Sequence, residues 1–64
     1  MVTVNGETKD AAGKNLYEFL CEEGYDVSRV VVECNLEIIP RENLKKITIA
    51  DEDSIEVLRF VGGG

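Results

Sequence analysis

Hydrophobic and polar residues alternate at the start of the chain, which is the pattern of a β-strand with one buried face. Val2 and Val4 alternate with polar residues, and the pair Asn5-Gly6 follows directly. Asn-Gly is a strong signal for a two-residue hairpin turn, because both turn residues need a positive φ. We therefore expect a second strand to return through residues 8–11.

The next apolar residues recur at helical spacing after a capping signal. Asn15 is a good N-cap, and Glu18 three residues later completes a capping box. Gly24 supplies the left-handed residue that commonly ends a helix. We expect a helix of about two turns. It should bury one apolar stripe, formed by Leu16, Phe19 and Leu20.

Short apolar segments separated by turn residues follow the helix. Residues 30–34 are rich in β-branched side chains and predict a third strand, and residues 38–39 predict a brief fourth one that Pro40 ends. The segment 40–44 is typical of a loop or a single helical turn. After an acidic turn at residues 51–53, residues 55–61 predict the last strand.

The order of these elements favours one α+β fold. In a right-handed arrangement the first and last strands lie side by side in the centre of a mixed sheet of four to five strands, and the single helix covers one face. This is the β-grasp, or ubiquitin-like, architecture. We expect residues 1–61 to form this domain and residues 62–64 to be a flexible glycine tail.

Size and charge narrow the class of function. The 64 residues allow one small domain, and a hydrophobic content of 44% is sufficient for a core. The formal net charge of −6 argues against a nucleic-acid partner, whose phosphates would repel the domain. No stretch is long enough to span a membrane, so we expect a cytoplasmic protein. The charge suits a protein partner with a basic docking face.

The sequence contains little that could perform catalysis or bind a metal. Cys21 and Cys34 are the only cysteines, and there is no histidine, so a zinc site is not expected. Both cysteines fall at apolar positions, which predicts small buried side chains. A disulfide or persulfide role is the alternative. We expect no catalytic residue in this chain.

The C-terminal glycines are the most informative residues for function. Gly62, Gly63 and Gly64 lack a Cβ, so they fit a narrow channel in a partner enzyme, and the carboxylate of a terminal glycine is unhindered. This suits a protein whose own C-terminus is the reacting group. The alternative is a simple flexible spacer.

The strand before the tail predicts where a partner docks. Successive side chains of a strand point to opposite faces, so Ile55 and Val57 should face the helix. Leu58 and Phe60 should then be exposed on the open face next to the tail, with Val61 beside them, and we expect these three residues to dock the partner. Burying Leu58 and Phe60 would contribute roughly 3–5 kcal/mol. That would offset the cost of ordering the tail, about 1–2 kcal/mol per residue.

Arg59 should point to the same side as Ile55 and Val57, near the edge of that face. Its aliphatic part can lie on the core while the guanidinium reaches water.

Four short motifs, in this order, resemble the ThiS family of bacterial sulfur carriers. They are an opening Val-Asn-Gly-Glu at residues 4–7, Glu33-Cys34-Asn35, Ile39-Pro40-Arg41-Glu42, and the end from Arg59 to Gly64. The resemblance covers essentially the whole chain. Two positions depart from the family pattern, with Leu36 where glycine is common and Leu44 where tryptophan is common. Neither affects the tail.

The resemblance implies a protein cosubstrate and not an enzyme. In this family an E1-like adenylyltransferase uses ATP and Mg²⁺ to adenylate the terminal glycine, here Gly64. Sulfur from a persulfide-bearing donor protein or from sulfide then gives a thiocarboxylate, which thiazole synthase uses. No cofactor is expected on the chain itself. Two alternatives remain open, the small subunit of molybdopterin synthase and a ubiquitin-like modifier joined to lysine.

Overall fold

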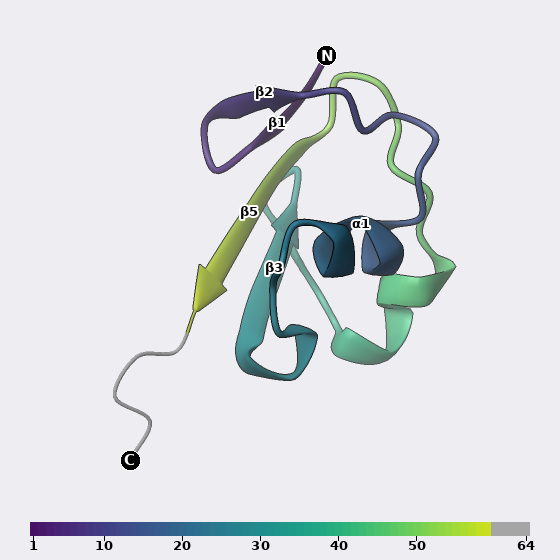
Figure 1. Cartoon of the computed structure of the whole chain (residues 1–64). Coiled ribbons are helices and arrows are strands. Elements are labelled where there is room, and N and C mark those ends of the chain that lie inside the picture. The colour runs from purple at the N-terminus through teal and green to yellow at the C-terminus, as the bar shows by residue number, and fades with distance from the viewer. Residues whose placement is uncertain (60–64) are drawn as a thin grey trace.

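The computed structural model describes residues 1–59, in which a twisted five-stranded sheet is covered on one face by a helix (Figure 1). The strand order is β2-β1-β5-β3-β4. β1 and β5 are parallel neighbours in the interior of the sheet, and the other strand pairs are antiparallel. The five strands are β1 (Val2–Val4), β2 (Glu7–Lys9), β3 (Val30–Cys34), β4 (Glu37–Ile39) and β5 (Ser54–Arg59). The predicted mixed sheet of the β-grasp is thus confirmed.

The helix α1 (Leu16–Glu22) begins and ends as its capping residues predict. The side-chain oxygen of Asn15 accepts a hydrogen bond from the N–H of Glu18 at 3.2 Å. At the other end Gly24 has a φ of +86°, and the N–H of Tyr25 donates to the carbonyl of Leu20 at 3.0 Å. This hydrogen bond, together with the left-handed conformation of Gly24, is the Schellman motif that commonly ends a helix.

Two short 3₁₀ helices complete the described chain. They are η1 (Val27–Arg29) and η2 (Arg41–Lys46). Arg41 connects them, since its Nε donates to the carbonyl of Val27 at 3.0 Å. The core between the sheet and the helices contains apolar side chains from every layer. Its buried members are Val2, Val4, Ala11, Leu16, Phe19, Leu20, Val27, Val30, Val32, Leu44, Ile49, Ile55 and Val57.

Two expectations from the sequence are wrong in detail. The second strand runs over Glu7–Lys9 and not over residues 8–11, because the two-residue turn places Glu7 opposite Val4 and the pairing ends where β1 begins, at Val2 and Lys9.

The side chain of Cys21 is exposed and not buried. Each helical residue rotates by about 100°, so the position after Leu20 points away from the buried stripe. Cys34 is partly buried and packs against the core, as expected.

The turn between β3 and β4 places a leucine in a conformation that favours glycine. Asn35 has a φ of +53° and Leu36 a φ of +71°, as a type I′ turn requires. Asparagine tolerates this region, but a left-handed conformation costs most other residues about 1–2 kcal/mol. The Leu36 side chain is 90% exposed, so burial in the monomer does not compensate for that cost.

We predict that Leu36→Gly stabilises the protein by about 0.5–1 kcal/mol, because relief of the strain exceeds the entropy that glycine adds to the unfolded chain. Urea unfolding followed by circular dichroism measures the change. The control is Glu37→Gly at the first residue of β4, which should destabilise by about the same amount. A less stable Leu36→Gly protein would show that the leucine makes compensating contacts.

Candidate functional site

Strand β5 presents alternate residues to the core and to the open face of the sheet. Ile55 and Val57 are 1% and 6% exposed, whereas Leu58 is 50% exposed. The predicted face assignment of these three residues is therefore confirmed. The other predicted site residues lie outside the described part of the chain; they are Phe60, Val61, Gly62, Gly63 and Gly64.

Leu58 has apolar neighbours on the open face that the sequence analysis did not identify. It is directly opposite Val31 in the β3–β5 register, and Ile38 lies on the same face opposite Glu33. Ile38 is 67% exposed, and it lines a shallow pocket together with Val31. We call Val31, Ile38 and Leu58 the outer apolar patch. The alternation of residues 30–34 would have identified Val31 had it been applied to that strand.

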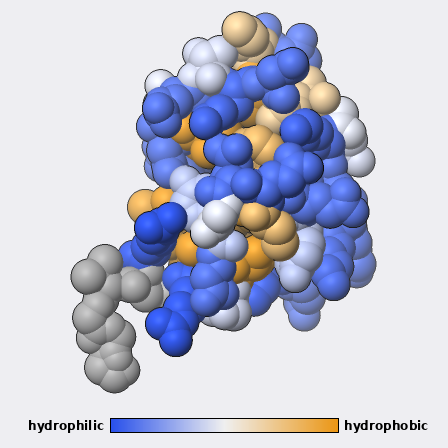
Figure 2. Space-filling model, in the orientation of Figure 1, coloured by the Kyte–Doolittle hydropathy of each residue, from blue (hydrophilic) through white to orange (hydrophobic). Residues whose placement is uncertain are grey.

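This patch belongs to a surface that is otherwise rich in polar residues. In the view of Figure 2 most of the visible surface is hydrophilic, and apolar atoms show mainly between polar side chains. Charged residues make up 31% of the sequence, and Glu33 and Glu56 lie opposite each other across β3 and β5. The outer apolar patch is therefore bordered by the carboxylates of Glu33 and Glu56.

Asn5 holds one edge of β5 in register. Its backbone N–H donates to the carbonyl of Ile55 at 2.9 Å. Its side-chain oxygen accepts a hydrogen bond from the N–H of Val57 at 2.8 Å. β1 itself pairs with β5 only as far as Val4 and Ile55. The asparagine side chain thus continues the ladder by one step beyond the end of β1.

Asn35 does the same at the opposite edge of β5. Its backbone N–H donates to the carbonyl of Ser54 at 2.8 Å, and its side-chain oxygen accepts from the N–H of Ser54 at 2.9 Å. Its amide nitrogen donates to a carboxylate oxygen of Asp53 at 3.0 Å. The Asn5-Gly6 turn has positive φ at both residues, like the Asn35-Leu36 turn. The asparagines of both type I′ turns therefore bond to the central strand.

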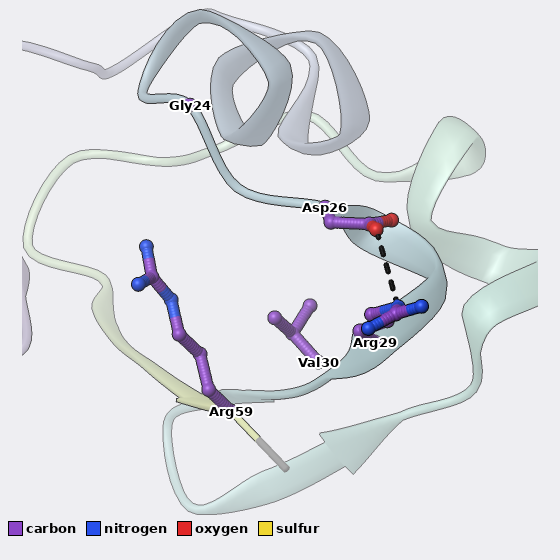
Figure 3. A pocket seen from close by; sticks show the side chains of 5 residues that line it. All are labelled: Gly24, Asp26, Arg29, Val30 and Arg59. Atoms are coloured by element: carbon purple, nitrogen blue, oxygen red, sulfur yellow. Dashed lines mark ion pairs between the residues drawn. The ribbon is translucent and has the colours of Figure 1, made fainter. Parts of the chain in front are cut away.

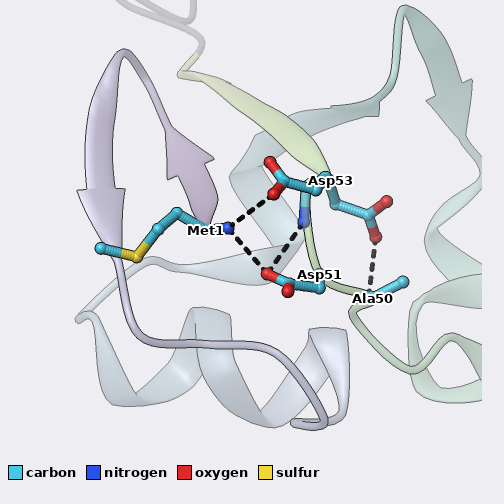
Figure 4. Close-up of polar contacts among 5 residues, drawn as sticks. Met1, Ala50, Asp51 and Asp53 are labelled. Atoms are coloured by element: carbon cyan, nitrogen blue, oxygen red, sulfur yellow. Dashed lines mark hydrogen bonds and ion pairs between the residues drawn. The ribbon is translucent and has the colours of Figure 1, made fainter.

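Asp53, which accepts the bond from the Asn35 amide, belongs to the acidic turn before β5. Figure 4 shows the polar contacts of that turn. The second carboxylate oxygen of Asp53 accepts from the N–H of Ala50 at 2.9 Å. Hydrogen bonds from Asn35 and from the Ala50 N–H lower the pKa of Asp53 below its ordinary value. In the same turn, Asp51 accepts from the ammonium group of Met1 at 2.7 Å. These hydrogen bonds connect the turn before β5 to the N–H of Ala50 and to the N-terminus.

Arg59 lies at the other end of β5, on the core side of the sheet, as predicted. Its guanidinium is stacked over the ring of Tyr25, 5.0 Å from the ring centroid. The Tyr25 hydroxyl accepts a hydrogen bond from the side-chain amide of Asn5 at 3.1 Å. Tyr25 is distant in sequence from β5, and no pattern in the chain indicates this contact.

Within residues 1–59 no group of three or more Cys, Asp or Glu side chains could hold a metal ion. Burial, and after it the charge of Asp53, raises the pKa of the Cys34 thiol. A raised pKa disfavours the reactive thiolate at neutral pH. What the site offers is a strand whose position is fixed and whose outer face carries apolar side chains.

Comparison with known proteins identifies the class and then the family. The fold is a ubiquitin-like β-grasp domain, and it matches the crystal structure of the thiamine biosynthesis protein ThiS from Geobacter metallireducens. The TM-score of that match is 0.77 at 39% identity, over 98% of this chain and 97% of the other. A family model described as the ThiS family matches residues 2–64. The chain belongs to the ThiS family.

Two curated relatives differ in length. The sulfur carrier protein ThiS of Bacillus subtilis is 35% identical over an alignment that covers the whole of both chains. A thiazole synthase of Paramagnetospirillum magneticum is 36% identical, over 98% of this chain but only 20% of that protein. This chain therefore spans about a fifth of the thiazole synthase that it matches. None of the helices within residues 1–59 is long and apolar enough to cross a membrane.

We predict that the Asp53 contacts stabilise the fold in a pH-dependent way. The folded-state pKa is lowered, so the contribution is complete above the ordinary aspartate pKa of about 4 and is lost as the pH falls through the lowered value. Asp53→Asn should therefore cost about 1 kcal/mol at pH 7 and less in acid. Urea unfolding at pH 7 and below pH 4 measures the difference between wild type and variant.

The matched control for this prediction is Asp10→Asn. Asp10 is an exposed aspartate outside β5 and the acidic turn, so its replacement should change stability little at either pH. A gap between wild type and Asp53→Asn that stays constant with pH would contradict the electrostatic explanation.

Proposed function

We propose that this chain carries sulfur for the formation of the thiazole ring of thiamine, bound as a thiocarboxylate at Gly64. The observation that carries the proposal is the ThiS-family match, which includes Gly62 to Gly64. The end-to-end alignment with the Bacillus subtilis sulfur carrier supports it. So does the position of the tail in the sequence, since Gly64 is five residues after the end of the fixed central strand at Arg59.

The proposed chemistry begins with activation, because a carboxylate is a poor electrophile. An E1-like adenylyltransferase binds ATP and Mg²⁺, a carboxylate oxygen of Gly64 attacks the α-phosphorus, and pyrophosphate leaves. Hydrosulfide then attacks the acyl carbon, and AMP leaves, so that a thiocarboxylate remains. A persulfide on a donor protein would give an acyl disulfide first, which a second thiol would cleave. ATP and Mg²⁺ belong to the partner, and this chain serves only as the cosubstrate.

Thiazole synthase is the proposed acceptor of the sulfur. Relatives named thiazole synthase from Paramagnetospirillum magneticum and Magnetococcus marinus match this chain over a fifth of their own length. A region similar to the carrier therefore occurs in the same polypeptide as the synthase, which supports contact between the two. Because activation consumes ATP, we place the carrier in the cytoplasm.

The proposed docking surface includes residues that the structure describes and two residues that follow them in the sequence. Leu58 is half exposed beside Val31 and Ile38, and Phe60 and Val61 follow it in sequence. A partner that covers the outer apolar patch would hold the carrier while Gly62 and Gly63 enter the channel that leads to its active site. Burial of apolar area would supply most of the binding free energy.

We predict that Leu58→Asp weakens binding to the adenylyltransferase at least tenfold and leaves the domain folded, because the side chain is half exposed. Isothermal titration calorimetry and thermal melting measure the two effects. The control is Val57→Asp one residue earlier, which places a charge in the core and should unfold most of the protein. An unfolded Leu58→Asp protein would place Leu58 in the core instead.

The sharpest prediction concerns the length of the tail. Deleting Gly64 shortens its reach by about 3.5 Å and pulls the carboxylate away from the α-phosphate. Adding one alanine after Gly64 moves the carboxylate beyond its site, so both variants should lose loading. Intact-mass spectrometry after incubation with the adenylyltransferase, ATP and sulfide measures the exchange of oxygen for sulfur. If the extended chain is loaded as fast as the wild type, the proposed function is wrong.

A further inference from the structure

A shallow pocket of about 240 Å³ lies on the core side of the sheet, at the end of β5 that precedes the tail (Figure 3). The loop after α1, the short helix η1 and the ends of β3 and β5 surround it. The proposed function assigns no role to this pocket. Its lining residues are Gly24, Asp26, Arg29, Val30 and Arg59.

One wall of the pocket is the guanidinium of Arg59. Its stacking on Tyr25 orients the group, and the hydrogen bond from Asn5 to the Tyr25 hydroxyl holds the ring in turn. A contact with a ring does not use the N–H groups of a guanidinium as hydrogen-bond donors to oxygen, so they remain able to donate to a carboxylate. Within residues 1–59 no carboxylate forms an ion pair with Arg59.

The opposite wall carries Arg29 and Asp26, with Val30 between this pair and Arg59 (Figure 3). Arg29 Nε lies 3.6 Å from a carboxylate oxygen of Asp26, and the Arg29 side chain is 82% exposed. The other Asp26 oxygen accepts from the hydroxyl of Ser28 at 2.6 Å and from its N–H at 3.1 Å. These contacts keep Asp26 engaged, so the two arginines leave the pocket with one positive charge in excess.

This charge selects the class of ligand. A phosphate or another polyvalent anion would be repelled by the carboxylate of Asp26 and by a chain with a net charge of −6. A single carboxylate matches the excess charge, and the flat fork of Arg59 suits it geometrically. The position of the pocket indicates which protein supplies this carboxylate, because Arg59 in the pocket wall is the last described residue before the tail. An enzyme that acts on Gly64 must come close to it.

We propose that this pocket receives an aspartate or glutamate side chain of the adenylyltransferase that loads the tail. The proposal rests on the proposed function and adds a second contact to it. Leu58 and Arg59 point to opposite faces of β5, so the enzyme would hold the strand from both sides. Arg59 and Arg29 would act on recognition and not on the chemical step, since neither side chain belongs to the reacting group.

The test measures loading of the full chain at a series of carrier concentrations, with the adenylyltransferase of the same organism, ATP and sulfide. Arg59→Glu and Arg29→Glu should each raise KM about tenfold or more and leave kcat within about twofold. Because both arginines contact one carboxylate, the double variant should lose less than the product of the two effects. The control is Lys46→Glu, an equal charge change at an exposed position on η2, which should leave KM nearly unchanged.

The other outcomes of this experiment distinguish an error in the proposed function from an error in the docking proposal. If the wild type is not loaded, the proposed function is wrong, and the docking proposal with it. If the wild type is loaded but the arginine variants keep its KM, or change no more than Lys46→Glu, only the docking proposal is wrong. If the KM increases of the two single variants multiply in the double variant, Arg59 and Arg29 make separate contacts and share no carboxylate. Thermal melting checks folding, and Arg59→Gln, which removes the charge at similar size, replaces Arg59→Glu if that variant unfolds.

Discussion

The register of β5 is the constraint on which the rest of this structure depends. A single-residue slip of a strand moves every side chain to the opposite face. Here that slip would expose Ile55 and Val57 and bury Glu56 and Leu58. The backbone pairing with β1 is only two residues long, so pairing alone holds that edge weakly. The side-chain oxygen of Asn5 accepts a hydrogen bond from the N–H of Val57, and that of Asn35 accepts one from the N–H of Ser54.

Each asparagine thus both forms its turn and bonds to the neighbouring strand. The type I′ turn needs a residue that accepts a left-handed conformation, and asparagine is the best of the side-chain-bearing residues for this. Its amide also places a donor and an acceptor at the end of a hairpin, where the neighbouring strand still has unpaired backbone groups. A glycine in place of Asn35 would keep the turn and the backbone bond to Ser54 but lose the side-chain bonds to Ser54 and Asp53.

The elements that could be predicted from the sequence are those set by local rules. Asn5-Gly6 specified the first hairpin, Asn15 and Gly24 bounded the helix, and the β-branched run gave β3 its correct limits of Val30 and Cys34. Alternation along β5 also gave the outward position of Leu58. These features depend on neighbours within a few residues, so a single sequence contains the information.

What could not be predicted depends on residues that meet only after folding. The contact of Arg59 with Tyr25 joins two segments 34 positions apart in the sequence, and nothing near either residue indicates it. The neighbours of Leu58 on the open face follow from the register of β3 and β4, which is a property of the sheet. Cys21 is exposed although cysteine is apolar, because the angle of a residue around the helix decides whether its side chain faces the core.

The distribution of charge suggests two different effects, one on the rate of encounter with a partner and one on the contact formed afterwards. The acidic residues Asp51, Glu52 and Asp53 precede β5, whereas Arg29 and Arg59 line the pocket at its far end. At physiological ionic strength charge acts over about 8 Å, so the long-range field of an acidic domain mainly affects the rate of encounter. The pocket acts at hydrogen-bond distance, after encounter. In the proposed complex, an acidic carrier would approach a basic face and would still place an arginine against one carboxylate, beside the proposed channel for the tail.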